Sequence, residues 1–325
     1  MNNLPKAMYL NPLIMFFIGM AGSGKTTLVH RISIDLSFIK KNHYIINLDP
    51  AAIACPYTPN IDIRDTIDYK KIMKDYFLGP NGAILTSLNL FSTRFSQIKN
   101  IIEANETRFD YILIDTPGQI EVFTWSASGS ILCESFSANY PTVNLFIIDL
   151  SRSINPMTFV SNVLYSCGIL YRTKIPTFII INKKDITSID FIREWLDDFE
   201  SFDHSLVKEN FFAGSFARSL ALTLDNFYKK TFFLGVSAFS GVGTFRLFNV
   251  IKKIIYEFKI QFQANLEKFL SQKISYINKI VFKKNEIFKK KKDAGESDIL
   301  DYLDILDFLT TLKIENDKIY IIGIK

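Results

Sequence analysis

Residues 19–27 read Gly19-Met-Ala-Gly22-Ser23-Gly24-Lys25-Thr26-Thr27, which satisfies the pattern G-x-x-x-x-G-K-[ST]. The pattern follows the apolar run Leu13–Ile18 and opens a helical stretch, as a strand, a turn and a helix would. Glycines let backbone N–H groups turn inward around phosphate oxygens, and the helix N-terminus adds positive potential. In such a loop Lys25 reaches the β- and γ-phosphates and the Thr26 hydroxyl ligates Mg²⁺. The stretch predicts a phosphate-binding loop whose nucleotide contacts are Gly22, Ser23, Gly24, Lys25, Thr26 and Thr27.

Around this loop, short apolar runs alternate with helical patterns from residue 13 to about residue 260. The runs are β-branched or aromatic and apolar on both faces, which is typical of a parallel sheet covered by helices. The expected strands are Leu13–Ile18, Tyr44–Leu48, Tyr111–Ile114, Val143–Ile148, Thr177–Ile181 and Phe232–Val236. The expected crossover helices lie in Thr27–Lys40, Ser87–Ala104, Pro156–Leu170 and Gly243–Phe262. The fold class is therefore α/β, a P-loop NTPase with a mostly parallel, doubly wound sheet.

Two parts of the chain depart from this alternation. Residues 190–230 are longer than one crossover needs and predict a mostly helical insertion. After residue 262 the charges segregate: residues 268–292 hold nine lysines and one acid, and residues 293–317 hold eight acids and one lysine. We expect one nucleotide-binding domain over residues 1–262, insertion included, and a charged, helical C-terminal appendage over residues 263–325.

Within this appendage, Leu300, Leu303, Leu306 and Leu309 recur every three residues among acids, as in an amphipathic helix. Such a helix binds a partner or an export factor, or it packs back on the domain, and both readings stay open. The run Lys289–Lys292 is a nuclear import signal or a charged linker.

A second motif reads Asp115-Thr-Pro-Gly118-Gln119 and follows the apolar run Tyr111–Ile114. An acid at the carboxyl end of a buried strand can hold Mg²⁺, which makes Asp115 a metal-ligand candidate beside Thr26. A glycine permits its amide to approach the γ-phosphate, and Gln119 stands where a water-orienting side chain sits in many GTPases. The pattern D-x-x-G is weak alone and becomes informative downstream of a phosphate-binding loop.

The third motif reads Asn182-Lys183-Lys184-Asp185, again at the end of an apolar run. The carboxylate of Asp185 can accept hydrogen bonds from N1–H and the 2-amino group of guanine, whereas adenine offers the opposite pattern at that edge. A buried carboxylate left unpaired by the wrong base costs about 1–3 kcal/mol or more. The motif therefore indicates GTP rather than ATP as substrate, with GDP as product. Ser237-Ala238, after the last expected strand, is a candidate guanine-facing loop.

Composition excludes several other functions. The net charge of +5 over 325 residues does not support direct nucleic-acid binding over the whole surface. Cys55, Cys133 and Cys167 lie far apart, which disfavours a metal cluster or a metal-delivering GTPase and fits a reducing compartment. No apolar run approaches the ~20 residues that span a bilayer, so we expect no membrane contact and a cytoplasmic protein.

A further signature is Gly79-Pro80-Asn81, placed between a helical segment and Gly82-Ala83. Its specificity comes from neighbouring stretches, which read Asn47-Leu-Asp49-Pro-Ala51, Ile61-Asp-Ile-Arg64-Asp65, Thr86-Ser-Leu-Asn-Leu90, Asp115-Thr-Pro-Gly-Gln-Ile-Glu-Val-Phe-Thr-Trp-Ser126, Ser151-Arg-Ser-Ile-Asn-Pro156 and Gly235-Val-Ser-Ala238. Together these resemble the GPN-loop GTPases, most closely the eukaryotic first-paralogue branch of XPA-binding-protein type. The resemblance covers roughly residues 12–260.

The resemblance implies a dimerising class of P-loop GTPases related to the signal-recognition GTPases. In this class Asn81, in a loop shaped by Gly79 and Pro80, would reach the γ-phosphate region of the partner protomer. An Asn amide can donate a hydrogen bond to developing phosphoryl charge, which gives that placement a chemical purpose. Asp49 matches the family's acid near Mg²⁺ and the attacking water, so Asn81, Gln119, Asp49 and Lys25 are the expected catalytic residues.

The resemblance also implies partners and location. The dimer is a homodimer or a heterodimer with a GPN-loop paralogue, and the branch is associated with the assembly and nuclear import of RNA polymerase II. RNA polymerase II subunits are then the expected clients, with shuttling between cytoplasm and nucleus. Arg64 is either an alternative to Asn81 as the donor to developing phosphoryl charge or an exposed helix arginine, and the second role is preferred. A scaffold that holds GTP without turnover stays open, whereas a P-loop kinase is disfavoured because no arginine-rich lid is found and the third motif argues for guanine.

Overall fold

The computed structural model describes residues 12–207, 218–220, 222–223, 231–251, 314–315 and 318–319. The chain divides into two compact units, residues 1–259 and residues 260–325. In the second unit, β8 (Ile314–Glu315) pairs with β9 (Lys318–Ile319) in antiparallel fashion. The expected domain boundary at residue 262, the leucine repeat of residues 300–309 and the lysine run of residues 289–292 lie outside the described residues.

A parallel sheet forms the centre of the first unit, with the strand order β3-β2-β4-β1-β5-β6-β7. The strands are β1 (Leu13–Gly19), β2 (His43–Asn47), β3 (Ile61–Asp62), β4 (Tyr111–Asp115), β5 (Thr142–Asp149), β6 (Thr177–Asn182) and β7 (Phe233–Gly235). The six strands expected from the sequence are confirmed, with small shifts at their ends. β3 was not expected, because a strand of two residues is too short to show a hydrophobic pattern.

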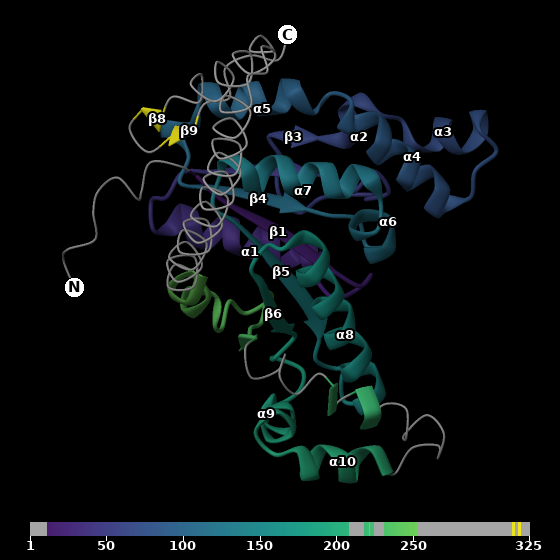
Figure 1. The fold of residues 1–325 in the computed structure, drawn as a ribbon, viewed down its shortest axis with the longest axis vertical. Helices are drawn as coiled ribbons and strands as arrows, with labels where there is room; N and C mark the ends of the chain where they lie inside the picture. The colour runs from purple at the N-terminus through teal and green to yellow at the C-terminus, as the bar shows by residue number, and fades with distance from the viewer. Residues whose placement is uncertain are drawn as a thin grey trace, which may run out of the picture. The chain divides into compact units, whose positions relative to one another are not determined.

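Helices cover both faces of this sheet (Figure 1). The core on one face gathers residues of α2 (Ile63–Thr66), α3 (Tyr69–Asp75), α4 (Pro80–Ser92), α5 (Phe95–Ala104), α6 (Ile120–Thr124), α7 (Ala127–Asn139), α8 (Pro156–Thr173), α9 (Asp190–Asp197) and α10 (Phe199–Val207). The other face packs against α1 (Lys25–Phe38) and the helical residues 244–251. Alternate residues of β1 enter the two cores: Ile14 and Phe16 the first, Met15 and Phe17 the second. The doubly wound α/β fold class is confirmed.

The segment Ser87–Ala104, expected as one crossover helix, instead falls in two helices. α4 ends at Ser92 and α5 begins at Phe95. The Ser92 hydroxyl donates to the Asn89 carbonyl oxygen at 2.7 Å, and the Thr93 hydroxyl donates to the Leu90 carbonyl oxygen at 2.7 Å. Such back-bonding competes with the helix ladder and ends the helix there. In the expected insertion, α9 and α10 are helical as predicted, and residues 208–217 and 224–230 lie outside the described residues.

The tripeptide Gly79-Pro80-Asn81 is a junction between a loop and a helix. Gly79 is the N-cap of α4, and Pro80 and Asn81 form its first turn. Proline suits this position because the first turn lacks an intrahelical acceptor for its N–H. The expectation that all three residues lie in a loop is therefore wrong for Pro80 and Asn81. All three are exposed.

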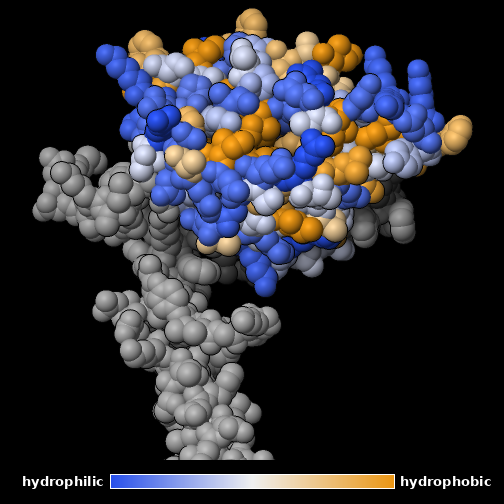
Figure 2. Space-filling model, turned by 90° about the horizontal axis from the view of Figure 1, so that it is seen from above, coloured by the Kyte–Doolittle hydropathy of each residue, from blue (hydrophilic) through white to orange (hydrophobic). Residues whose placement is uncertain are grey.

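The surface of the first unit mixes polar and apolar residues. Seen from the end where α5 lies in Figure 1, apolar side chains form small groups among hydrophilic ones (Figure 2). Within the described residues, no helix combines the length and apolar character required to cross a membrane.

Candidate nucleotide-binding site

The phosphate-binding loop joins β1 to α1 at the centre of the sheet, where the chain switches from one side of β1 to the other. Gly22 and Gly24 adopt positive φ values of 80° and 89°, a conformation that other residues reach with strain. A Cβ atom on Gly24 would lie 2.4 Å from Nδ2 of Asn182, so only glycine fits this position. The loop therefore owes its shape to these glycines and to Asn182.

Lys25 lies buried beneath the loop. Its Nζ donates hydrogen bonds to the carbonyl oxygens of Gly19 at 2.9 Å and Met20 at 3.1 Å. Burial lowers the pKa of Lys25, and the nearby carboxylates of Asp115 and Asp49 oppose that shift. A lysine held among carbonyl oxygens and two acids is placed to turn toward phosphate oxygens when a nucleotide enters the loop.

Thr26 and Asp115 form one side of the site. The Thr26 hydroxyl lies beside the Asp115 carboxylate, whose pKa it helps to lower. Oδ2 of Asp115 accepts a hydrogen bond from the Tyr57 hydroxyl at 2.8 Å, while Oδ1 is buried without a partner among the described residues. Burial raises the pKa of Asp115 to about 6. An orphaned buried carboxylate oxygen beside a threonine hydroxyl fits a hard cation such as Mg²⁺.

Asp49 joins this group from the segment after β2. Its Oδ1 accepts a hydrogen bond from the Ala51 N–H at 2.9 Å, and the Gly118 N–H lies near enough to help lower its pKa. Burial raises the pKa of Asp49, and the hydrogen bond from the Ala51 N–H and the charge of Lys25 oppose that rise. The Gly118 amide, expected to face a γ-phosphate, therefore lies near the Asp49 carboxylate.

Gln119 lies directly after Gly118, at the start of α6. Its Oε1 is buried and has no hydrogen-bond partner within the described part of the chain. A buried amide oxygen normally finds a donor, and a water molecule would supply one. This placement fits the water-orienting role that the sequence suggests for Gln119.

Asn182 connects the phosphate-binding loop to the candidate base-binding loop. Its Nδ2 donates to the Ser23 carbonyl oxygen at 2.9 Å, and its Oδ1 accepts from the Ala238 N–H at 3.0 Å. Asp185 lies in the same region, where Oδ1 accepts a hydrogen bond from the buried Ser237 hydroxyl. The structure thus brings residues 19–27, 182–185 and 237–238 together around one site.

Lys183 makes an ion pair that the sequence analysis did not identify. Its Nζ lies 2.6 Å from Oδ2 of Asp149, the last residue of β5. Burial alone would raise the pKa of Asp149, but hydrogen bonds from Lys183 and Ser151 outweigh it and hold that pKa below its usual range. An acid at the end of a buried strand was the signal that singled out Asp115, and the same signal applies to Asp149. Lys184, by contrast, is exposed.

Arg64 is not the exposed helix arginine that was expected. Its guanidinium binds both carboxylate oxygens of Asp62, at 2.9 and 2.6 Å, and donates to the Ala52 carbonyl oxygen at 2.9 Å. The hydrogen bond to Asp62 raises the pKa of Arg64 further. Asp62 also accepts from Nδ2 of Asn47 at 3.1 Å. Arg64 therefore anchors the loop after Asp49, and no sequence pattern marked this role.

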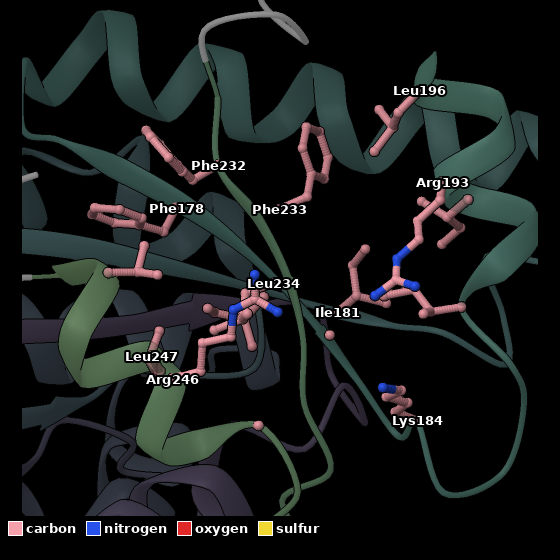
Figure 3. A pocket seen from close by; sticks show the side chains of 16 residues that line it. Phe178, Ile181, Lys184, Arg193, Leu196, Phe232, Phe233, Leu234, Arg246 and Leu247 are labelled. Atoms are coloured by element: carbon pink, nitrogen blue, oxygen red, sulfur yellow. The ribbon is translucent and has the colours of Figure 1, made fainter. Parts of the chain in front are cut away.

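A cavity of about 370 Å³ lies beside the edge strand β7, away from the phosphate-binding loop. Figure 3 shows Phe178, Phe232 and Phe233 at one end of it and Lys184 at the other. None of the residues of the phosphate-binding loop lines this cavity, nor does Asp185. The convergence of loops at the carboxyl ends of the strands identifies the nucleotide site better than cavity size does.

A phosphate-binding loop on a parallel sheet, with acids beside it and a second loop tied to it by Asn182, defines a P-loop nucleoside triphosphate-binding protein. Residues 17–257 match the family described as "Conserved hypothetical ATP binding protein". The chain is 48% identical over 262 residues to GPN-loop GTPase 1 of Dictyostelium discoideum, covering 81% of this chain and 66% of that protein. It is 44% identical over 288 residues to GPN-loop GTPase 1 of Saccharomyces cerevisiae, covering 86% and 72%. The match thus spans just under two thirds of the Dictyostelium relative.

Among solved structures, the chain resembles that of a Pyrococcus abyssi GTPase in its apo form. The TM-score is 0.64 and the sequence identity 28%, over 76% of this chain and 96% of that one. The chain belongs to the GPN-loop GTPase family. The resemblance inferred from residues 12–260 is therefore confirmed.

Proposed function

We propose that this chain binds GTP with Mg²⁺ and hydrolyses it to GDP and phosphate. The observation that carries the proposal is the double hydrogen bond of Asn182, to the Ser23 carbonyl oxygen and the Ala238 N–H. This bond ties the loop that holds the phosphates to the loop that faces the base, with Asp185 beside it. The names of the relatives, which are GPN-loop GTPases, support the same activity.

During hydrolysis a water oxygen bonds to the γ-phosphorus while the bond from that phosphorus to the β–γ bridging oxygen breaks. GDP then leaves, and the proton of the water passes to the phosphate or the solvent. Lys25 exchanges the Gly19 and Met20 carbonyl oxygens for phosphate oxygens, and Gln119 and Asp49 orient the water. Mg²⁺, held by Thr26 and by Asp115 and Asp49 directly or through water, would offset phosphate charge.

The matched family description names ATP, whereas the relatives are named GTPases. The chemistry of Asp185 favours guanine over adenine. Its carboxylate oxygens accept from N1–H and the 2-amino group of guanine, whereas N1 of adenine carries no donor. Phosphate release by the purified chain, measured with GTP and with ATP, tests the proposal. We expect release with GTP. Equal turnover of ATP would refute the guanine assignment, and release with neither would refute hydrolysis.

Replacing Gln119 with alanine should slow GTP turnover by roughly 10- to 100-fold and leave GTP affinity nearly unchanged. The reason is that its unpartnered Oε1 is available to a water molecule and makes no hydrogen bond to the phosphate-binding loop. Single-turnover phosphate release and fluorescent-nucleotide binding measure the two quantities separately. Turnover equal to that of the unsubstituted chain would remove Gln119 from the mechanism.

We further propose that the chain acts as a dimer, homodimeric or paired with a GPN-loop paralogue, and that Asn81 completes the partner's site. The exposed position of Asn81 in the first turn of α4 supports this, because an exposed amide at a helix start is free to meet a second protein. Sedimentation with GDP and with a non-hydrolysable GTP analogue, alone and with the paralogue, tests it. A chain that stays monomeric throughout would refute the dimer.

Asn81→Ala should then lower turnover by roughly tenfold or more while leaving GTP affinity intact, because one donor to developing charge is lost. Asn100, on α5, is a matched asparagine outside the site, and Asn100→Ala should turn over GTP normally. The decisive measurement mixes Asn81→Ala chains with chains that carry Gln119→Ala. If Asn81 acts across the dimer, each mixed dimer contains one site with both an intact Gln119 and an intact Asn81, so the mixture should turn over GTP faster than either variant alone. An effect confined to the substituted protomer would contradict action across the dimer.

The biological role that we propose is assembly and nuclear import of RNA polymerase II, with shuttling between cytoplasm and nucleus. It is supported by the family to which the chain belongs. Depletion of the chain in its own cells should leave RNA polymerase II subunits in the cytoplasm. Normal nuclear polymerase after depletion would refute this role and leave the GTPase assignment untouched.

A further inference from the structure

Arg152 lies against the phosphate-binding loop, and the mechanism above assigns it no task. It follows β5 by three residues, and its Nη1 donates a hydrogen bond to the Ala21 carbonyl oxygen at 3.2 Å. Its Nη2 lies 3.2 Å from the position that a Cβ atom on Gly22 would occupy. The side chain is 64% exposed. An accessible guanidinium therefore borders the loop that is expected to hold the triphosphate.

Arg152 and the water-orienting segment after β4 lie on opposite sides of the phosphate-binding loop. β1, which leads into the phosphate-binding loop, lies between β4 and β5 in the sheet. The loop after β4 brings Gly118 against Ala21, because a Cβ atom on Gly118 would lie 3.3 Å from the Ala21 Cβ. The loop after β5 brings Arg152 against Ala21 from the other side. Gly118 and Arg152 thus flank the same residue of the loop.

Asp149, the acidic neighbour of Arg152, forms its closer ion pair with Lys183. Asp149 has its Oδ2 at 2.6 Å from the Nζ of Lys183, whereas the Nε of Arg152 is 3.6 Å from that oxygen. Within the described part of the chain, the terminal nitrogens of Arg152 have the neutral Ala21 carbonyl oxygen as their acceptor. A phosphate oxygen is charged and accepts a stronger hydrogen bond from a guanidinium than a carbonyl oxygen does.

We propose that Arg152 is a further phosphate-contacting residue that acts on the nucleotide of its own chain. When GTP occupies the loop, its guanidinium leaves the Ala21 carbonyl oxygen and donates to γ-phosphate oxygens. It offsets the charge that develops as the bond to GDP breaks. The inference deepens the proposed GTP hydrolysis and rests on it.

The test compares Arg152→Ala with a matched arginine variant. Arg193 is 62% exposed and pairs with Asp190 three residues earlier at 3.5 Å, much as Arg152 pairs with Asp149, but it lies on α9. For Arg152→Ala we expect turnover at saturating GTP to fall at least about tenfold, with GDP affinity unchanged within about twofold. The complex with GDP and aluminium fluoride, which mimics the transferring phosphate, should be lost. Arg152→Lys should recover part of the turnover, and Arg193→Ala should behave as the unsubstituted chain.

Two outcomes would overturn the inference. One is unchanged turnover by Arg152→Ala. The other is an equal loss of GTP and GDP affinity with a lower melting temperature, which would mean that Arg152 only holds the loop in shape. If the unsubstituted chain binds GTP without hydrolysing it, the proposed hydrolysis fails. The contact between Arg152 and the phosphate is then tested by binding affinity alone. In that case Arg152→Ala must weaken the binding of a non-hydrolysable GTP analogue relative to that of GDP. An unchanged ratio of the two affinities refutes the contact.

Discussion

Replacing Asp185 with asparagine is expected to change the preferred substrate from GTP to xanthosine triphosphate. The aspartate accepts hydrogen bonds from N1–H and the 2-amino group of guanine, and an asparagine offers one acceptor and one donor at that place. Each lost bond to a charged group is worth about 1.5–3 kcal/mol, so the kcat/KM for GTP should fall roughly 100-fold or more. Xanthine carries an oxygen where guanine carries its amino group, and that oxygen accepts from the new amide.

The measurement is phosphate release by Asp185→Asn with GTP, xanthosine triphosphate and ATP in parallel. Asp190 provides a matched control, because it too is exposed and accepts a hydrogen bond from a serine hydroxyl, that of Ser188, but on α9. Asp190→Asn should retain the preference for GTP. If Asp185→Asn kept full activity with GTP and gained none with xanthosine triphosphate, Asp185 would not contact the base.

In the described structure Asp185 already accepts the Ser237 hydroxyl. That hydroxyl in turn accepts a hydrogen bond from the Ser240 N–H at 3.1 Å. The carboxylate is therefore held by a buried serine before any base arrives, which fixes the direction of its remaining lone pairs. This explains why a serine stands there, a residue that the sequence marked only through a common dipeptide.

The positions of the main motifs could be predicted because they coincide with strand ends. β1, β4 and β6 are buried apolar runs, and each is followed by one motif. Since the carboxyl ends of parallel strands lie at one edge, three motifs far apart in sequence had to meet. The phosphate-binding loop alone needed no such argument, because its glycines and its lysine specify a backbone shape.

Contacts between side chains of different segments could not be predicted. The Tyr57 hydroxyl reaches Asp115 across 58 positions, and Arg64 reaches back to Ala52. Neither residue belongs to a spaced pattern, and each contact depends on how one loop folds over another. The pairing of Asp149 with Lys183 could have been expected from the strand ends alone, since β5 and β6 are neighbours whose last residues, Asp149 and Asn182, lie in register.

Asn182 links the two loops of the candidate site. One side chain holds the Ser23 carbonyl oxygen and the Ala238 N–H, and it lies where a Cβ atom on Gly24 would collide with it. We therefore expect a shift of the phosphate-binding loop on nucleotide entry to move residues 237–238 as well. Loss of GTP affinity on changes in either loop is the expected consequence, because both loops share one hydrogen-bonding partner.

Replacing Lys25 with alanine should have the largest effect of all on hydrolysis. Its Nζ donates hydrogen bonds to two loop carbonyl oxygens. Burial lowers its pKa, and the nearby carboxylates of Asp115 and Asp49 oppose that lowering. Without the Lys25 ammonium group, Mg²⁺ alone would balance the triphosphate and the two carboxylates. We expect turnover to fall at least about 100-fold and GTP to bind more weakly than GDP, because the γ-phosphate adds charge where the balance is lost.

Two further variants separate charge from folding. Lys25→Met keeps the apolar stem and should be as inactive as Lys25→Ala, and Lys25→Arg keeps the charge but cannot reproduce the compact ammonium group, so it should recover little. Lys99, an exposed lysine of α5 that pairs with Glu103 at 3.5 Å, is the control whose replacement should leave turnover unchanged. Circular dichroism verifies that each variant is folded. A folded Lys25→Met chain that hydrolyses GTP at the normal rate would show that residues 19–27 do not hold the γ-phosphate, and the site would have to be sought elsewhere in the chain.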